Sequence, residues 1–126
     1  MNKPNTTRRQ LIKALAAAPL AGSGALWAQG TWPQGPVKIV VGFPPGGGTD
    51  ALARVLAPKL TTMWGQQVIV ENRAGVAGVL AADVVAKSTD GLTLLMGHIN
   101  SHGIGPALNP KMPYNAETDF SPLALV

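Results

Sequence analysis

The residues most able to bind a ligand in this sequence form a proline–glycine run at positions 44–48, followed by Thr49 and Asp50. Gly46, Gly47 and Gly48 carry no Cβ, so the backbone can approach a bound group closely. The unpaired N–H groups at the start of a following helix, together with its dipole, favour an anion. Two or three such donors would fix a carboxylate without a basic side chain, at about 1.5–3 kcal/mol each. A tight turn without a ligand is the alternative, and the local sequence does not separate the two.

Nucleotide binding is the second chemistry that this glycine run suggests. The run lacks the Gly-Lys-Ser/Thr ending of a P-loop, which excludes Walker-type binding. Gly46, Gly48 and Ala51 do fit the G-x-G-x-x-A dinucleotide pattern, and Glu71 lies far enough along the chain to meet a ribose. The two prolines before the glycines count against this, because proline removes N–H donors where a pyrophosphate needs them. An exported NAD(P)-dependent oxidoreductase using the Gly46–Ala51 loop therefore stays as the alternative to a protein that is not an enzyme.

Two histidines four residues apart, His98 and His102, are the other candidates for chemistry. That spacing suits two metal ligands on a helix, but the neighbouring glycines and Asn100 favour a loop, and no cysteine or nearby carboxylate completes a metal site. Ser101 lies beside His102, but adjacent loop residues seldom form a nucleophile–base pair, and the sequence has no G-x-S-x-G elbow. The sequence therefore predicts no metal site, no catalytic residue and no cofactor.

The elements that position these residues are predicted to alternate between strand and helix. Apolar runs predict strands at 37–43, 67–71 and 92–96, and a fourth beginning near Phe120. One helix, capped by Thr49 or Asp50 and ended by Gly65, follows the first strand, and another at 76–87 follows the second. Residues 97–114 are predicted to be mostly loop, with a helical turn at 106–108.

Helical spacing also predicts which side chains of the two helices are buried. The expected inner positions are Leu52, Val55, Leu56, Leu60 and Met63 in the first helix, and Leu80, Ala81, Val84 and Val85 in the second. Pro58 should kink or split the first helix near Ala57, because its ring clashes with the carbonyl of Arg54. Asp83 and Lys87 should form an exposed pair one helical turn apart.

The alternation of strands and helices implies two right-handed βαβ units and a parallel sheet. The loops that follow the three strands then leave the sheet at one edge, formed by the carboxyl ends of the strands. Ligands of open α/β sheets bind at that edge. We therefore expect the functional residues within 43–50, 72–75 and 97–105.

Charge and length limit the classes of function. The chain has 126 residues, no cysteine and a formal net charge of +4. Four basic residues lie within the first thirteen positions, and basic and acidic residues balance from Gln29 onward. Nucleic-acid binding needs basic residues clustered in the folded part, so no nucleic-acid partner is expected. The absence of cysteine is compatible with an oxidising compartment.

The first 28 residues are predicted to be an export signal. A basic segment containing Arg8 and Arg9 precedes an Ala-rich apolar stretch at 14–26, which is too short to span a bilayer comfortably. Paired arginines followed by Leu-Ile-Lys resemble a twin-arginine signal, and an ordinary secretory signal is the alternative. Cleavage is expected after Ala28. No later segment is long and apolar enough to predict a membrane span.

Several motifs in order along the chain resemble one family of proteins. They are GFPPGGGTDALAR, VIVENRAG, AKSTDGLTLLMG, HGIGPALNPKMPY and DFSPLALV, and together they cover residues from about 32 to 126. They resemble the Bug family, the solute receptors of tripartite tricarboxylate transporters. The departures are Ala74 where the family usually has proline, Val79 where a second glycine is common, and Pro58 within a helix.

The resemblance implies a periplasmic-binding-protein-like clamshell of two α/β lobes that hold a small carboxylate through backbone amides and bridging water. It implies a binding loop in the first lobe, a helix cap, and polar contacts from the loop after the third strand. These ligand-binding residues are Phe43, Pro44, Pro45, Gly46, Gly47, Gly48 and Thr49, then His98, Asn100, Ser101 and His102, with Asp50 as the helix cap.

The resemblance also implies a setting for the protein. It predicts a periplasmic receptor, expected to be a monomer, that presents its solute to integral membrane subunits of a transporter. Members of the family are more than twice as long as this chain. Residues 29–126 are therefore expected to form an incomplete first lobe, truncated near the crossover to the second.

Overall fold

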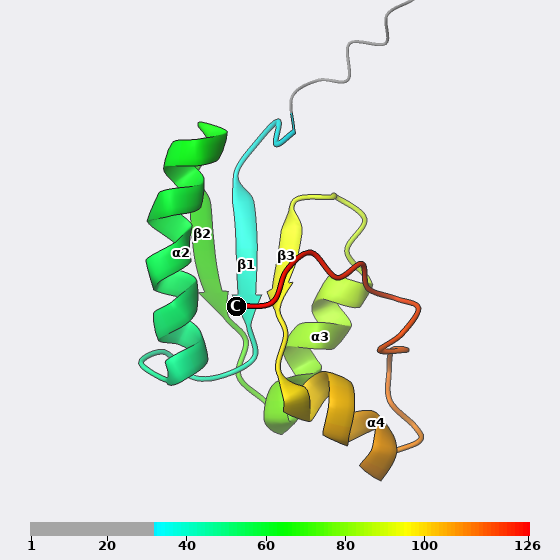
Figure 1. Ribbon diagram of the computed structural model, residues 1–126. Helices are drawn as coiled ribbons and strands as arrows, with labels where there is room; N and C mark the ends of the chain where they lie inside the picture. Colours follow the sequence, from blue (N-terminus) through cyan, green and yellow to red (C-terminus); the bar gives the residue numbers. More distant parts are fainter. Residues whose placement is uncertain (1–31) are drawn as a thin grey trace, which may run out of the picture.

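The computed structural model describes residues 32–126, so the predicted export signal lies outside the described residues. Its centre is a sheet of three parallel strands, β1 (Val37–Val41), β2 (Val68–Asn72) and β3 (Thr93–Met96). Their order across the sheet is β2-β1-β3, which leaves β2 and β3 each with one unpaired edge (Figure 1). The three predicted strands and the parallel sheet are confirmed.

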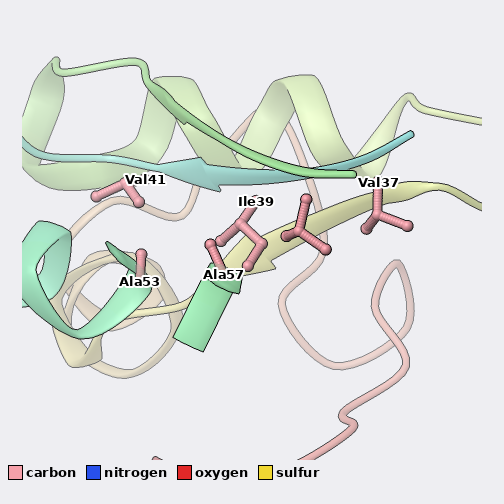
Figure 2. Packing of buried hydrophobic residues seen from close by; sticks show 6 residues of the cluster. Val37, Ile39, Val41, Ala53 and Ala57 are labelled. Carbon is pink, nitrogen blue, oxygen red and sulfur yellow. The ribbon is translucent and has the colours of Figure 1, made fainter. Parts of the chain in front are cut away.

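Helices cover both faces of the sheet, as the α/β prediction required (Figure 2). The long helix α2 (Gly48–Trp64) lies on one face, and the short helix α3 (Val79–Ala86) lies on the other. A one-turn 3-10 segment, η1 (Val76–Gly78), precedes α3. After β3, a π-helical turn η2 (Asn100–Ile104) continues into α4 (Gly105–Leu108).

The core is made by the central strand and the small residues of α2. Val37, Ile39 and Val41 alternate along β1 toward the same face, where they pack against Ala53 and Ala57 (Figure 2). All five residues are buried. Alanine at these two positions lets the helix backbone approach the sheet closely. The start of α2 is thereby fixed beside the end of β1.

The buried face of α2 differs from the prediction. Leu60 and Leu56 are half-buried, but Leu52, Val55 and Met63 are at least half exposed. The helix turns its small residues, one helical turn apart, toward the sheet, and its larger side chains lie to the sides. In α3 the predicted burial of Ala81 is confirmed and Ala82 is also buried, but Leu80 and Val84 are exposed, contrary to the prediction.

Pro58 does not split α2, contrary to the expectation from the sequence. The helix runs unbroken from Gly48 to Trp64 with Pro58 inside it. Pro58 and Arg54 both lie on the exposed side of the helix, where solvent can satisfy the carbonyl that loses its N–H donor. Beyond the proline, the Thr61 hydroxyl donates to the Ala57 carbonyl at 2.8 Å.

The region after β3 differs from the prediction in two ways. Residues 100–108 are helical, so the predicted turn at 106–108 is confirmed but begins earlier. The predicted fourth strand is absent among the described residues, because residues 120–126 form no ladder with a neighbouring strand.

The predicted pair of Asp83 and Lys87 is confirmed at 2.6 Å between Oδ1 and Nζ. Within residues 32–126, no helix has the length and apolar character needed to cross a membrane.

Candidate functional site

The loops after the three strands meet at one edge of the sheet, as predicted. A Cβ added to Gly42, at the end of β1, would lie 2.6 Å from the Cα of Gly78 in η1. A Cβ added to Gly78 would lie 3.6 Å from both the Phe43 ring and the Ser101 side chain. Glycine at these two positions therefore lets the segments after β1, β2 and β3 pack together. They form a continuous surface at the carboxyl edge.

The glycine run opens α2 and leaves its first amides uncovered. Gly47 is the N-cap, with φ −80° and ψ 168°, and no side chain caps the helix. Its carbonyl accepts the N–H of Ala51 at 2.9 Å, which closes the first helical turn. No atom lies within 4 Å of a Cβ placed on Gly46 or Gly48. Apart from the adjacent residues and the helix's own backbone, these two positions are open to solvent, and the first N–H groups of a helix have no partner within it.

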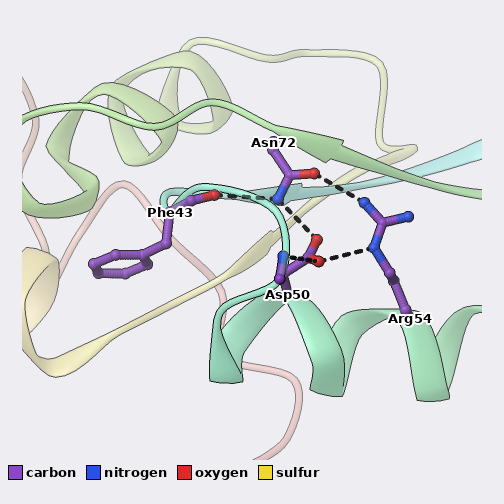
Figure 3. Close-up of polar contacts among 5 residues, drawn as sticks. Phe43, Asp50, Arg54 and Asn72 are labelled. Carbon is purple, nitrogen blue, oxygen red and sulfur yellow. Dashed lines mark hydrogen bonds and ion pairs between the residues drawn. The ribbon is translucent and has the colours of Figure 1, made fainter.

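Asp50 organises this loop through a network that reaches three segments (Figure 3). Its Oδ2 accepts the Gly46 N–H at 2.8 Å and the Arg54 Nε–H at 2.8 Å. Its Oδ1 accepts from the Asn72 side chain at 2.8 Å, and the same amide group donates to the Phe43 carbonyl at 3.1 Å. Arg54 closes the network by donating to Asn72 Oδ1 at 3.1 Å. The loop after β1 is thus tied to α2 and to the end of β2.

The prediction that Asp50 caps α2 therefore needs correction. Asp50 is the third residue of the helix, and its carboxylate binds back to Gly46, one residue before the Gly47 N-cap. Thr49 is likewise inside the helix and is not the cap. The Arg54 guanidinium, the Gly46 N–H and Asn72 hold the pKa of Asp50 well below its usual range. The charged carboxylate accepts the Gly46 N–H, whereas no side chain binds the N–H groups of the first helical turn.

Phe43 and His98 bring the loops after β1 and β3 together. Their ring centroids lie 4.7 Å apart in an edge-to-face arrangement. His98 Nδ1 accepts the backbone N–H of Asn100 at 3.2 Å. Figure 3 shows the Phe43 ring directed away from the Asp50 network. Pro44 and Pro45 are exposed beside it.

Ser101 and His102 lie farther inside the molecule than the prediction placed them. Ser101 is only 2% exposed, and its hydroxyl lies 2.9 Å from both the His98 carbonyl and His102 Nδ1. The buried Tyr114 hydroxyl donates to the Ser101 carbonyl at 2.6 Å. Burial lowers the pKa of His102 and raises that of Tyr114. In this arrangement Ser101 fixes the π-helical turn and does not reach the open edge.

The two histidines do not converge on a common point. The His98 ring packs on Phe43, whereas the His102 ring packs on Phe120 at a centroid distance of 4.7 Å. No group of three or more metal-binding side chains occurs among residues 32–126. The structure thus brings the Phe43 ring beside His98, and the Ser101 hydroxyl binds the His98 carbonyl, whereas the His102 ring lies against Phe120.

Arg54 and Gly78 lie outside the segments in which functional residues were expected, and Asn72 lies within one of them, although no contact was predicted for it. Arg54 follows Asp50 at the spacing of one helical turn, and this pairing is a signal that could have been noticed. Asn72 ends β2 at the carboxyl edge, but its bonds to Phe43 and Asp50 join residues 29 and 22 positions apart. Gly78 packs against the loops after β1 and β3, which are distant in sequence, so no local pattern predicts this contact.

Comparisons with known proteins agree on one family. A family model described as the tripartite tricarboxylate transporter family receptor matches residues 52–126. Protein BugT of Bordetella pertussis is 44% identical over 124 residues, which are 97% of this chain and 38% of BugT. The chain spans 29–38% of the length of the curated relatives it matches.

Two solved structures from Rhodopseudomonas palustris share the fold. MatC with bound malate is 42% identical, with a TM-score of 0.71 over 75% of this chain and 32% of that one. A protein with adipate is 39% identical, with a TM-score of 0.65 over 69% of this chain and 29% of that one. Identities at this level, the parallel sheet and the family match together give one conclusion: this chain belongs to the family of tripartite tricarboxylate transporter receptors.

Proposed function

We propose that this chain forms a lobe of a periplasmic receptor that captures a small carboxylate, and that the carboxylate binds at the start of α2. The proposal rests on the first turn of that helix, which no side chain caps. The three glycines at its start have no other side chain packed against them. Asp50 fixes the loop before any solute arrives, so little conformational freedom is lost on binding. The malate and adipate of the two solved relatives agree with an acid as the solute.

We infer a role for each residue of the loops at this edge. The N–H groups of Gly47, Gly48 and Thr49 would donate to the carboxylate, while Phe43, Pro44 and Pro45 would line one side. Gly46 would shape the loop, because its own N–H already binds Asp50. His98 and Asn100 would contribute polar contacts from the loop after β3, and Ser101 and His102 would hold that loop in place.

The setting of the receptor is part of the same proposal. We infer that residues 1–28 direct export to the periplasm and that the receptor delivers its solute, as a monomer, to integral membrane subunits of a transporter. Support comes from the basic, Ala-rich N-terminal sequence and from membership of the family. The protein acts by binding and release, without turnover.

A proline substitution tests whether the amides hold the solute. Gly48 is the first helical residue, a position that accepts proline well, and the ψ of 168° at Gly47 suits a residue before proline. Gly48→Pro removes one N–H donor and should raise the Kd for malate or adipate at least about tenfold. Isothermal titration of the full chain measures this.

The matched control is Gly48→Ala, which keeps the N–H and adds only a Cβ in open space. We expect the Kd of this variant to stay close to that of the unsubstituted chain. Equal affinity of the proline and alanine variants would refute the amide mechanism. A chain that is stabilised by NAD(P) and not by any carboxylate would instead support the oxidoreductase alternative, which the comparisons do not favour.

A further inference from the structure

The basic side chains near the carboxyl edge are already paired with internal partners. Arg54 donates to Asp50 and Asn72, and Arg73 donates to Glu71 at 2.7 Å. His98 Nδ1 accepts the backbone N–H of Asn100. The four lysines within residues 32–126 lie outside the loops at this edge. The amides of α2 are therefore the group there best able to bind a negative charge.

The same edge presents apolar side chains to solvent. Val76 after β2 and Ile99 after β3 are 73% and 65% exposed. Gly78, two residues after Val76, lies beside the Phe43 ring, and His98, next to Ile99, stacks edge-to-face on it, so both exposed residues belong to segments that meet at that ring. A solute held by its carboxylate at α2 would meet a hydrocarbon surface.

Val76 is held in this position against the preference of its backbone. Its φ is +45° and that of Ala77 is +53°, between Gly75 at +155° and Gly78 at +92°. The Gly78 N–H donates to the Gly75 carbonyl at 3.0 Å, which closes a left-handed turn. Such angles are unfavourable for a β-branched residue and are typical of sites where a side chain is displayed for function.

We propose that Val76, with Phe43 and Ile99, contacts the carbon skeleton of the solute and makes this lobe selective for carboxylates whose skeleton near the bound end is unsubstituted hydrocarbon. A hydroxyl on that part of the solute would lose its water without gaining a partner. The inference rests on the proposed carboxylate site at α2. It names the class of solute as aliphatic or aromatic acids in preference to hydroxy acids.

A matched pair of ligands tests the selectivity. Succinate and malate differ by one hydroxyl, and adipate offers a longer hydrocarbon chain. We expect the full chain to bind succinate about tenfold more tightly than malate, a ratio typical of small changes against an apolar surface. Adipate should bind at least as tightly as succinate. Isothermal titration at one pH and ionic strength gives the three Kd values.

Val76→Asn tests the residue, because asparagine tolerates the left-handed turn while placing a polar group on the surface. The Kd for adipate should rise about tenfold and that for malate should hardly change. Urea unfolding should show a variant no less stable than the unsubstituted chain. Met63→Gln, which alters an equally exposed apolar residue near the other end of α2, is the control and should leave all Kd values unchanged.

Two results separate this inference from the proposed function. Malate binding as tightly as succinate, or adipate binding unchanged in Val76→Asn, would overturn the selectivity while leaving the carboxylate site in place. No binding of any of the three acids would overturn both. A rise in the adipate Kd that also occurs in Met63→Gln would show a nonspecific effect and would count against Val76.

Discussion

At the scale of single residues, the site depends on one buried carboxylate. Asp50 is 2% exposed, yet its charge is matched by three donors from three different segments. A negative residue is tolerated beside the proposed anion site because its oxygens are bound by the Gly46 N–H and by the Arg54 and Asn72 side chains. The sequence predicted Asp50 as the cap of the helix. It did not find Arg54 and Asn72 as partners, since one of them lies 22 positions away.

Asp50 should make the stability of the protein depend on acid pH. Its pKa is lower in the folded protein than its ordinary value of 3.8, so the unfolded chain takes up the proton first as the pH falls. The stability that Asp50 contributes is therefore present above pH 4 and is lost progressively below it. Asp50→Asn should be less stable at pH 7 and should show a shallower loss between pH 5 and pH 3, measured by urea unfolding.

The control for this prediction is Glu117→Gln, which removes an exposed carboxylate far from the loop in sequence. Its curve should run parallel to that of the unsubstituted chain. Some acid sensitivity should persist in Asp50→Asn, because the N–H of Leu92 and the hydroxyl groups nearby lower the pKa of Asp90 to about 2. Superimposable pH profiles for Asp50→Asn and the unsubstituted chain would contradict the role of Asp50.

At the scale of elements, the sequence predicted the three strands and the two helices between them, but not which face of each helix packs against the sheet. The strands were predictable because continuous apolar runs with β-branched residues fit a sheet covered on both faces. The buried faces of α2 and α3 were not, because the spacing of large apolar residues conceals the small alanines that touch the sheet. The left-handed angles at Val76 and Ala77 also run against the preference of those residues, so no local rule predicts them.

The meeting of the first two loops should depend on the absence of a side chain at Gly42. A Cβ there would lie 2.6 Å from the Cα and 3.2 Å from the carbonyl oxygen of Gly78, and both are backbone atoms that cannot rotate away. Gly42→Ala should lower the free energy of unfolding by about 1–3 kcal/mol. Gly35→Ala is the control, because its Cβ would meet only the Leu92 side chain, at 3.6 Å. Equal unfolding midpoints in urea for the two variants would contradict the close contact.

At the scale of the whole molecule, order is concentrated around β1 and α2. The central strand is paired on both sides and packed on both faces, while residues 120–126 form no regular structure and are exposed beyond Phe120. The sequence predicted the parallel arrangement and the edge at which the three loops meet. The prediction of a fourth strand was wrong, because an apolar run forms a strand only when it can hydrogen-bond to the edge of a neighbouring strand.

This contrast should appear in hydrogen exchange. Amides of β1 and of the middle of α2 should exchange most slowly, because their opening requires loss of the core. Amides of residues 120–126 should exchange fastest, at rates close to those of an unstructured peptide. NMR or mass spectrometry of the full chain measures both. Slow exchange in residues 120–126 would mean that this segment pairs with a strand in solution.

The unpaired edge of β3 has a practical consequence for handling the protein. Thr93, Leu94, Leu95 and Met96 carry neither charge nor proline, the two features that most often discourage a second molecule from adding a strand. Concentrated samples should therefore lose monomer through intermolecular β-pairing at this edge before the core unfolds. Because β3 lies at the edge of the sheet, samples should be stored dilute. Light scattering should confirm that they are monomeric before any titration.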